Sequence, residues 1–315
     1  MRLRAAHLTA AAVSAFALGL AGCQAAGGTG SPAGNSGAGP ALRVVATTTQ
    51  VADFGRNVGG DRIHLTQIVK PNVDPHDYEA SPADVQAIAT ADLVLKNGVG
   101  LEKFLDDTIT SAGFTGTVVD TSKGVTVHPG DAADKEGDPH IWHDPMNAKI
   151  MVRSIATAFE AKDPAGRATY EANEVAYAAK LDALDKGIRA EIDSVPTAQR
   201  KLVTNHDAFG YYVARYGLQF VGSIIPSFDT SAELSGRDIS DLVAKIKAAG
   251  VKAIFSESSL PPKTAEAIGS EAGVKVVEGD DALYGDSLGP PGSAGATYLA
   301  MEQHNTDTIV AALRG

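Results

Sequence analysis

Three of the eight histidines stand where strands meet loops, the position at which an α/β scaffold presents functional groups. His76 follows a strand-like run within a stretch rich in turn-forming residues, and His140 precedes an expected helix in a second such stretch. His206 directly follows the strand-like run Lys201-Leu202-Val203-Thr204. Because imidazole is the most common metal ligand in proteins, these three positions predict a transition-metal site.

Two of these histidines belong to the same tripeptide, Asp-Pro-His, at residues 74–76 and 138–140. Proline restricts φ and so holds the imidazole in place before a metal arrives. Asp74 and Asp138 could each accept the second ring N–H of a ligating imidazole and fix its tautomer; alternatively, each caps a turn. Glu257, after another strand-like run, could support the site, or it could be a helix cap or a surface carboxylate.

Cys23 is the only cysteine, so the mature chain can form neither an internal disulfide nor a thiolate metal site. It follows two arginines and an apolar run of roughly a dozen residues, which is typical of an export signal and too short to span a bilayer. The segment Leu20-Ala21-Gly22-Cys23 resembles the bacterial lipobox, whose cysteine is acylated and becomes the first mature residue. Residues 1–22 are therefore expected to be a lipoprotein signal peptide; the alternative is an ordinary secretory signal.

Without residues 1–22 the chain has 25 basic and 38 acidic residues, a formal net charge of −13. This charge argues against a nucleic-acid partner, because binding to nucleic acid requires a basic surface. Residues 24–41 are almost entirely small or polar and cannot bury enough apolar surface to fold. We expect residues 23–41 to form a flexible tether.

Eight short apolar runs predict strands, and helical patterns separate them, at residues 43–48, 63–69, 93–95, 117–119, 201–204, 218–221, 252–255 and 274–277. This alternation predicts an α/β fold with mostly parallel sheets. Residues 164–194 contain no strand signal, and their apolar residues recur at three- and four-residue steps, which predicts one helix of about 30 residues. The expected divisions are an N-terminal lobe (42–163), a linking helix (164–195) and a C-terminal lobe (196–315).

Over about residues 42–313, the chain resembles a known family, the substrate-binding lipoproteins of zinc and manganese ABC importers (ZnuA/TroA type). The segments that carry the resemblance are Asp74-Pro75-His76-Asp77-Tyr78-Glu79, Asp138-Pro139-His140-Ile141-Trp142, His206-Asp207-Ala208-Phe209-Gly210-Tyr211, Tyr284-Gly285-Asp286-Ser287-Leu288-Gly289, and Thr297-Tyr298-Leu299 with Met301 and Asn305. Each segment alone is a weak signal, but their order after a lipobox is specific. The resemblance implies two similar α/β lobes joined by one long rigid helix, with the metal site in the cleft between them.

The resemblance also implies four metal ligands: His76 and His140 from the N-terminal lobe, and His206 and Asp286 from the C-terminal lobe. Asp280 and Asp281 are nearby alternatives to Asp286. Asp286 is preferred because it precedes a serine and stands twelve positions before Tyr298, as the family's aspartate does.

The function implied by the resemblance is that of an exported solute-binding protein with no catalytic activity. Its lipid would anchor it to the outer face of the bacterial cytoplasmic membrane. As a monomer it would capture a divalent metal as cargo and deliver it to an ABC permease and its ATPase.

Three imidazoles and one carboxylate suit Zn²⁺, whereas Mn²⁺ prefers more oxygen and about six donors. Manganese-importing relatives usually have glutamate where this chain has His206, but some relatives with three histidines and one aspartate bind both ions, so Mn²⁺ is the alternative.

Since each imidazole must be neutral to bind metal, the affinity for metal should fall below about pH 6.5. The chain lacks the long His-rich loop of zinc-specific members: the segment 128–138 has one histidine, His128, among acidic residues, and either collects metal weakly or is a solvated surface loop.

The remaining histidines have simpler interpretations. His143 is either a further ligand or a surface histidine, with the surface position preferred, and His64 and His304 are expected to be structural or exposed.

The alternative functions are a secreted zinc hydrolase and an adhesin or surface scaffold stabilised by metal. The hydrolase is disfavoured because four ligands would close the coordination shell, and no His-Glu-x-x-His motif occurs.

Overall fold

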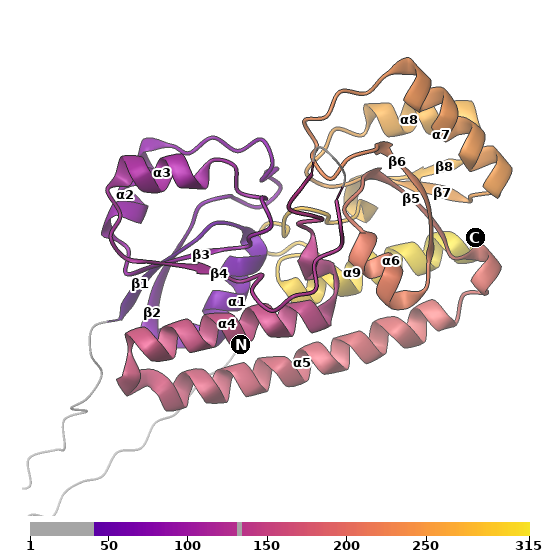
Figure 1. Ribbon diagram of the computed structural model, residues 1–315. Coiled ribbons are helices and arrows are strands. Elements are labelled where there is room, and N and C mark those ends of the chain that lie inside the picture. Colours follow the sequence, from indigo (N-terminus) through magenta and orange to yellow (C-terminus); the bar gives the residue numbers. More distant parts are fainter. Residues whose placement is uncertain (1–40, 131–133) are drawn as a thin grey trace, which may run out of the picture. The chain divides into compact units, whose positions relative to one another are not determined.

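The computed structural model describes residues 41–130 and 134–315. The expected signal peptide, Cys23 and residues 24–40 of the expected tether lie outside these described residues. In the described part, strands and helices alternate and form two parallel four-stranded sheets connected by a long helix (Figure 1). This arrangement confirms the predicted fold class.

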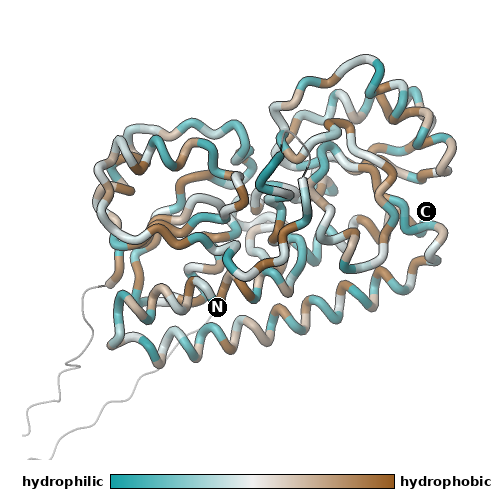
Figure 2. The backbone as a smooth tube through the Cα atoms, viewed as in Figure 1, coloured by the Kyte–Doolittle hydropathy of each residue, from teal (hydrophilic) through white to brown (hydrophobic). Residues whose placement is uncertain are grey.

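The first sheet has the strand order β2-β1-β3-β4, and every pair is parallel. Its strands are β1 (Leu42–Ala46), β2 (Ile63–Gln67), β3 (Leu93–Lys96) and β4 (Thr117–Asp120), and the helices between them are α1 (Thr49–Gly59), α2 (Pro82–Thr90) and α3 (Leu105–Ala112). The central strands are hydrophobic and almost fully buried, as expected for a parallel sheet covered on both faces (Figure 2).

The second sheet repeats this topology with the order β6-β5-β7-β8, again all parallel. Its strands are β5 (Lys201–His206), β6 (Gln219–Ile225), β7 (Ala253–Phe255) and β8 (Lys275–Val277), with α6 (Gly210–Tyr216), α7 (Gly236–Ala249) and α8 (Lys263–Ala272) between them. We call each sheet, with the helices that cover it, a lobe. The shared strand order shows that the two lobes are structural repeats.

Between the sheets the chain forms α4 (Pro145–Lys162) and then α5 (Arg167–Asp193). With 27 residues, α5 is about 40 Å long. Tyr177 and Leu181 belong to the hydrophobic core of the first lobe, Ile188 and Ile192 belong to that of the second, and Leu184 packs against both. The predicted long helix is therefore present and joins the two cores.

The last helix, α9 (Tyr298–Arg314), also contacts both cores. Tyr298 and Met301 pack in the first core, and Ile309 and Leu313 pack in the second. Five short 3-10 helices complete the described secondary structure, at Gly60–Arg62, Ile141–His143 (η2), Pro164–Gly166, Thr197–Gln199 and Gly279–Asp281 (η5). None of the helices in the described ranges is long and apolar enough to cross a membrane.

Candidate metal centre

His76 lies in the loop between β2 and α2, where the sequence predicted it. The Oδ1 atom of Asp74 accepts a hydrogen bond from the backbone N–H of His76 at 2.9 Å. After this loop, Ser81 caps α2 and forms a capping box with Asp84, with Pro82 as the first helical residue. A proline-containing loop between two fixed elements thus holds the buried His76 side chain.

His140 lies between β4 and η2, before the expected helix, α4, whose N-cap is Asp144. The Oδ1 atom of Asp138 accepts from both the backbone N–H of His140, at 3.0 Å, and its ring Nδ1, at 2.7 Å. Because Nδ1 carries the proton shared with this carboxylate, Nε2 is the ring atom available to a metal.

His206 is the last residue of β5 and is held in the same manner by a carboxylate from the neighbouring strand end. The Oε1 atom of Glu257 accepts from the backbone N–H of His206 at 3.1 Å and from its ring Nδ1 at 3.0 Å. Glu257 is therefore not a surface carboxylate: it is buried and bonded to His206.

Asp286 lies in the loop between η5 and α9 and is fully buried. Its Oδ1 atom is 3.3 Å from Nε2 of His140, 3.3 Å from Nε2 of His206 and 3.7 Å from Nε2 of His76. Within the described residues, neither oxygen of Asp286 has a hydrogen bond. A buried carboxylate without hydrogen bonds is costly unless a positive charge compensates it.

The four side chains converge on one point between the lobes. Nε2 of His140 is 3.2 Å from Nε2 of both His76 and His206, and one donor atom from each of the four residues lies within 4.8 Å of every other. Ligands about 2.0 Å from one tetrahedral ion stand about 3.3 Å apart. The spacing of the donor atoms therefore fits a single metal ion held by three nitrogens and one oxygen.

The electrostatics of the cluster favour a cation. Burial alone lowers the pKa of His140, but the hydrogen bond to Asp138 and the negative charges of Asp138 and Asp286 outweigh it and raise the pKa to about 9. For His206, burial also acts downward, and the charges of Asp286 and Glu257 raise its pKa well above the usual value. Burial raises the pKa of Asp286, but the surrounding imidazoles hold it well below its usual range. The cluster thus holds protons in the absence of metal, and a divalent cation can replace them.

The structure does not bring the other candidates into this cluster. Asp280 and Asp281 are exposed in η5, His64 is exposed in β2, and His304 bonds the Ala282 carbonyl from α9. The segment from His128 is described except for residues 131–133, and His128 stacks on Tyr211 at a centroid distance of 3.9 Å.

The prediction that His143 lies at the surface is wrong. His143 is fully buried, with Nδ1 2.8 Å from Oε1 of Glu302 and Nε2 3.1 Å from the Gly285 carbonyl oxygen. Both ring nitrogens thus have protein partners, so His143 is no metal ligand in this arrangement. Sequence reasoning missed Glu302, since it lies 159 residues from His143 and no motif connects them.

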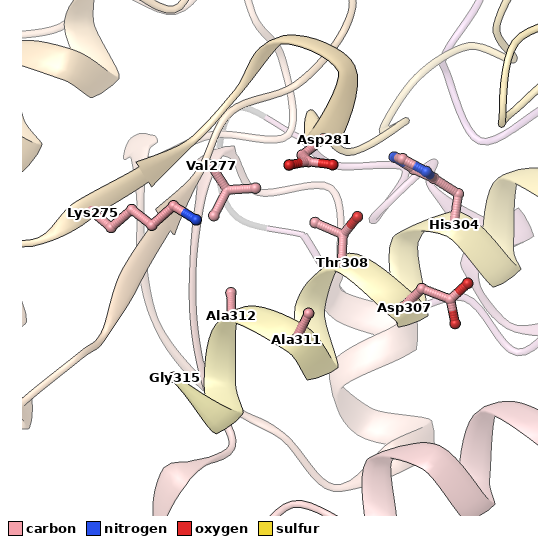
Figure 3. Close-up of a pocket in the computed structure, with 9 residues that line it drawn as sticks. All are labelled: Lys275, Val277, Asp281, His304, Asp307, Thr308, Ala311, Ala312 and Gly315. Carbon is pink, nitrogen blue, oxygen red and sulfur yellow. The ribbon is translucent and has the colours of Figure 1, made fainter.

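One cavity in the described structure reaches the four-residue cluster, and another lies apart from it. A cavity of about 240 Å³ reaches His76 and is also lined by Pro139, Phe228 and Asp229, so it connects the cluster with solvent. A separate cavity of about 410 Å³ lies between β8 and α9 and is lined by residues that include Asp281 and His304 (Figure 3). It contains none of the four clustered residues and is not part of the candidate centre.

Comparison with known proteins gives a consistent result. Residues 44–312 match the profile of the family described as "Zinc-uptake complex component A periplasmic". Similar proteins include the zinc-binding protein TroA of Treponema pallidum, 35% identical over 86% of this chain and 88% of TroA. The manganese-binding lipoprotein MntA of Bacillus subtilis is 33% identical over 91% of this chain and 94% of MntA.

The structure agrees with the sequence match. The solved structure of periplasmic zinc-binding TroA from Treponema pallidum superposes with a TM-score of 0.81, covering 87% of this chain and 99% of TroA at 32% identity. These relatives are named as metal-binding proteins, and other similar proteins are named as substrate-binding lipoproteins of ABC transporters, so the family consists of solute-binding proteins and not enzymes.

Proposed function

This chain belongs to the zinc-uptake complex component A family of metal-binding substrate-binding proteins of ABC transporters, and from that premise we propose that it captures Zn²⁺ outside the cell and delivers it to an ABC permease. The single observation that carries the proposal is the buried cluster of His76, His140, His206 and Asp286. We propose these four residues as the ligands of the transported ion.

The number and type of donors support zinc. Three imidazoles and one carboxylate complete a tetrahedral shell, whereas Mn²⁺ prefers about six donors with more oxygen. Donor spacing alone does not separate the ions, because neighbouring ligands of an octahedral ion stand similarly close. Manganese is the second candidate, since a similar protein, MntA, is named as manganese-binding.

Transport is a better test than affinity, because zinc outcompetes manganese at most sites of nitrogen and oxygen ligands. The gene should be deleted and growth followed in chelated medium with one metal restored at a time. We expect low zinc to restore growth. Rescue by manganese alone, with normal cellular zinc, would contradict the choice of zinc.

We further propose that Cys23 carries a lipid that holds the protein at the outer face of the membrane, with residues 23–41 as the tether. The lobes are proposed to occupy residues 42–163 and 196–315. Cys23→Ser should release the protein from the membrane fraction and leave zinc affinity unchanged, because the tether supplies no ligand. Retention of this variant in washed membranes would contradict lipid anchoring.

A further inference from the structure

Asp286 occurs late in the chain, but residues of the first lobe hold the backbone around it. The side-chain amide of Gln50 donates to the carbonyl oxygen of Asp286 at 3.0 Å. Thr49 Oγ1 accepts from the backbone N–H of Leu288 at 2.8 Å. Thr49 and Gln50 are buried at the start of α1, directly after β1.

The peptide that precedes Asp286 is held from the first lobe as well. The carbonyl oxygen of Gly285 accepts from Trp142 Nε1 and from His143 Nε2, each at 3.1 Å. Trp142 and His143 follow the candidate ligand His140 in η2, and Trp142 packs in the core of the first lobe. Glu302 fixes the other ring nitrogen of His143 at 2.8 Å.

Hydrogen bonds to the second sheet stop just before this loop. The backbone of Leu283 is bonded to Ser256 and Ser258, beyond the end of β7, at 2.9 Å each. Tyr284 is bonded through both its N–H and its carbonyl to the Asn305 side chain in α9, also at 2.9 Å. The hydrogen-bond partners of the chain thus change from the second lobe at Leu283 to the first lobe at Gly285.

One contact still connects Gly285 with the second lobe. Glu257, which supports His206, packs closely against Gly285, where a Cβ atom would lie 2.0 Å from Oε2. Packing against one glycine, however, constrains the loop less than hydrogen bonds on either side of Asp286.

We propose that Thr49, Gln50, Trp142 and His143 are positioning residues that attach Asp286 to the first lobe, so the four ligands divide three to one between the lobes. The inference rests on the proposed function, and it differs from the two-and-two division that the family resemblance implies. If the lobes separate, only His206 withdraws. His76, His140 and Asp286 remain together as a three-ligand site that retains the metal.

The test is zinc affinity in a mutant cycle, measured by competition with chelators of graded strength. Gln50→Met removes the amide donor at nearly constant volume and should weaken zinc binding about 5- to 10-fold in the wild-type background. His206→Ala should still bind zinc through the other three residues, and adding Gln50→Met to this variant should weaken zinc binding by the same factor as in the wild type. Adding Gln50→Met to Asp286→Ala should not weaken zinc binding further, because Gln50 acts through Asp286.

The matched control is Asn173→Leu, since Asn173 also donates a side-chain amide to a backbone carbonyl of the first lobe, that of Val58 at 2.9 Å. It should leave zinc affinity unchanged. If Gln50→Met does not fold, as judged by circular dichroism, Thr49→Val replaces it, with Thr121→Val as its control, because Thr121 bonds the Lys96 carbonyl elsewhere in the lobe.

Equal weakening in all three backgrounds would assign Gln50 a general structural role and overturn the proposal. A complete loss of zinc binding in His206→Ala, or no effect of Gln50→Met in that background, would overturn the three-to-one division. Failure of the wild-type protein to bind zinc would instead refute the proposed function, so the two failures are distinguishable.

Discussion

The two Asp-Pro-His segments have the same three residues and hold their imidazoles differently. In both, the aspartate accepts from the backbone N–H two residues later. Asp138 also accepts from the ring Nδ1 of His140, whereas the second oxygen of Asp74 accepts from the Thr230 hydroxyl at 2.6 Å. Thr230 lies between β6 and α7, so this bond crosses from the first lobe to the second.

The difference shows what a short sequence does and does not determine. An aspartate followed by proline forms the local backbone turn in both places, because that contact depends only on neighbouring residues. The second contact depends on which element lies beside the loop. Asp138 therefore orients an imidazole within the first lobe, and Asp74 links that lobe to the second.

The largest effect is expected from removing the imidazoles themselves. His76→Ala, His140→Ala and His206→Ala should each weaken zinc binding by more than about 100-fold, because losing a ligand costs more than losing its supporting partner. Calorimetry or chelator competition measures this. His64→Ala and His304→Ala are the controls and should bind as the wild type does; wild-type affinity in His206→Ala would remove it from the ligand set.

The aspartates give the most direct test of the comparison. Asp138→Asn should weaken zinc binding about 10- to 100-fold, because it removes the charge that orients the His140 ring. Asp74→Asn should cost less, since Asp74 bonds the backbone of His76 but not its ring. Equal losses in the two variants, or a larger loss in Asp74→Asn, would show that Asp74 supports its imidazole as Asp138 does.

The pH dependence follows from the raised pKa of His140. Because this pKa is about 9 in the metal-free protein, zinc must displace a proton at neutral pH, and affinity should fall about tenfold per pH unit for each proton displaced. The decline should begin near pH 9, above the value of 6.5 expected from the sequence. Protonation of His140 also stabilises the metal-free fold fully below pH 6.5, and this contribution is lost as pH rises through about 9.

Calorimetry in buffers of different ionisation enthalpy measures the protons released on binding. We expect at least one per zinc at pH 7. No proton release at pH 7, together with constant affinity between pH 7 and pH 9, would contradict the raised pKa of His140.

The smallest effect is expected from the hydrogen bond that connects Thr230 of the second lobe with Asp74 of the first. Thr230→Val removes the hydroxyl that bonds Asp74 and should weaken zinc binding about fivefold, the cost of one hydrogen bond. Thr157→Val is the control, because Thr157 bonds the Arg153 carbonyl within its own helix, α4. A faster loss of zinc to chelator in Thr230→Val, but not in Thr157→Val, would show that the bond between Thr230 and Asp74 holds the lobes together.

Much of the fold was predictable because its signals are local. All eight predicted strands are present. The central strands β1, β3, β5 and β7 are largely buried, because a parallel strand covered on both faces carries an apolar run. The helical spacing in residues 164–194 likewise predicted α5. The three histidines were identifiable because each stands at the end of a strand or in the loop after one.

What the sequence did not reveal depends on partners distant in the chain. The burial of His143 follows from Glu302 and Gly285, and nothing near His143 distinguishes it from a surface residue. The contact between Gln50 and the Asp286 backbone spans 236 residues. Glu257 could be named as a candidate, but its bond to His206 required β5 and β7 to be neighbours in the sheet.

The most direct test of the metal centre is X-ray absorption at the zinc edge of the zinc-loaded full chain. We expect four light donors about 2.0–2.1 Å from zinc, with the scattering pattern of three imidazole rings, and one fewer ring in His206→Ala. Six donors, or the same number of rings in the wild type and His206→Ala, would contradict a zinc ion held by His76, His140, His206 and Asp286.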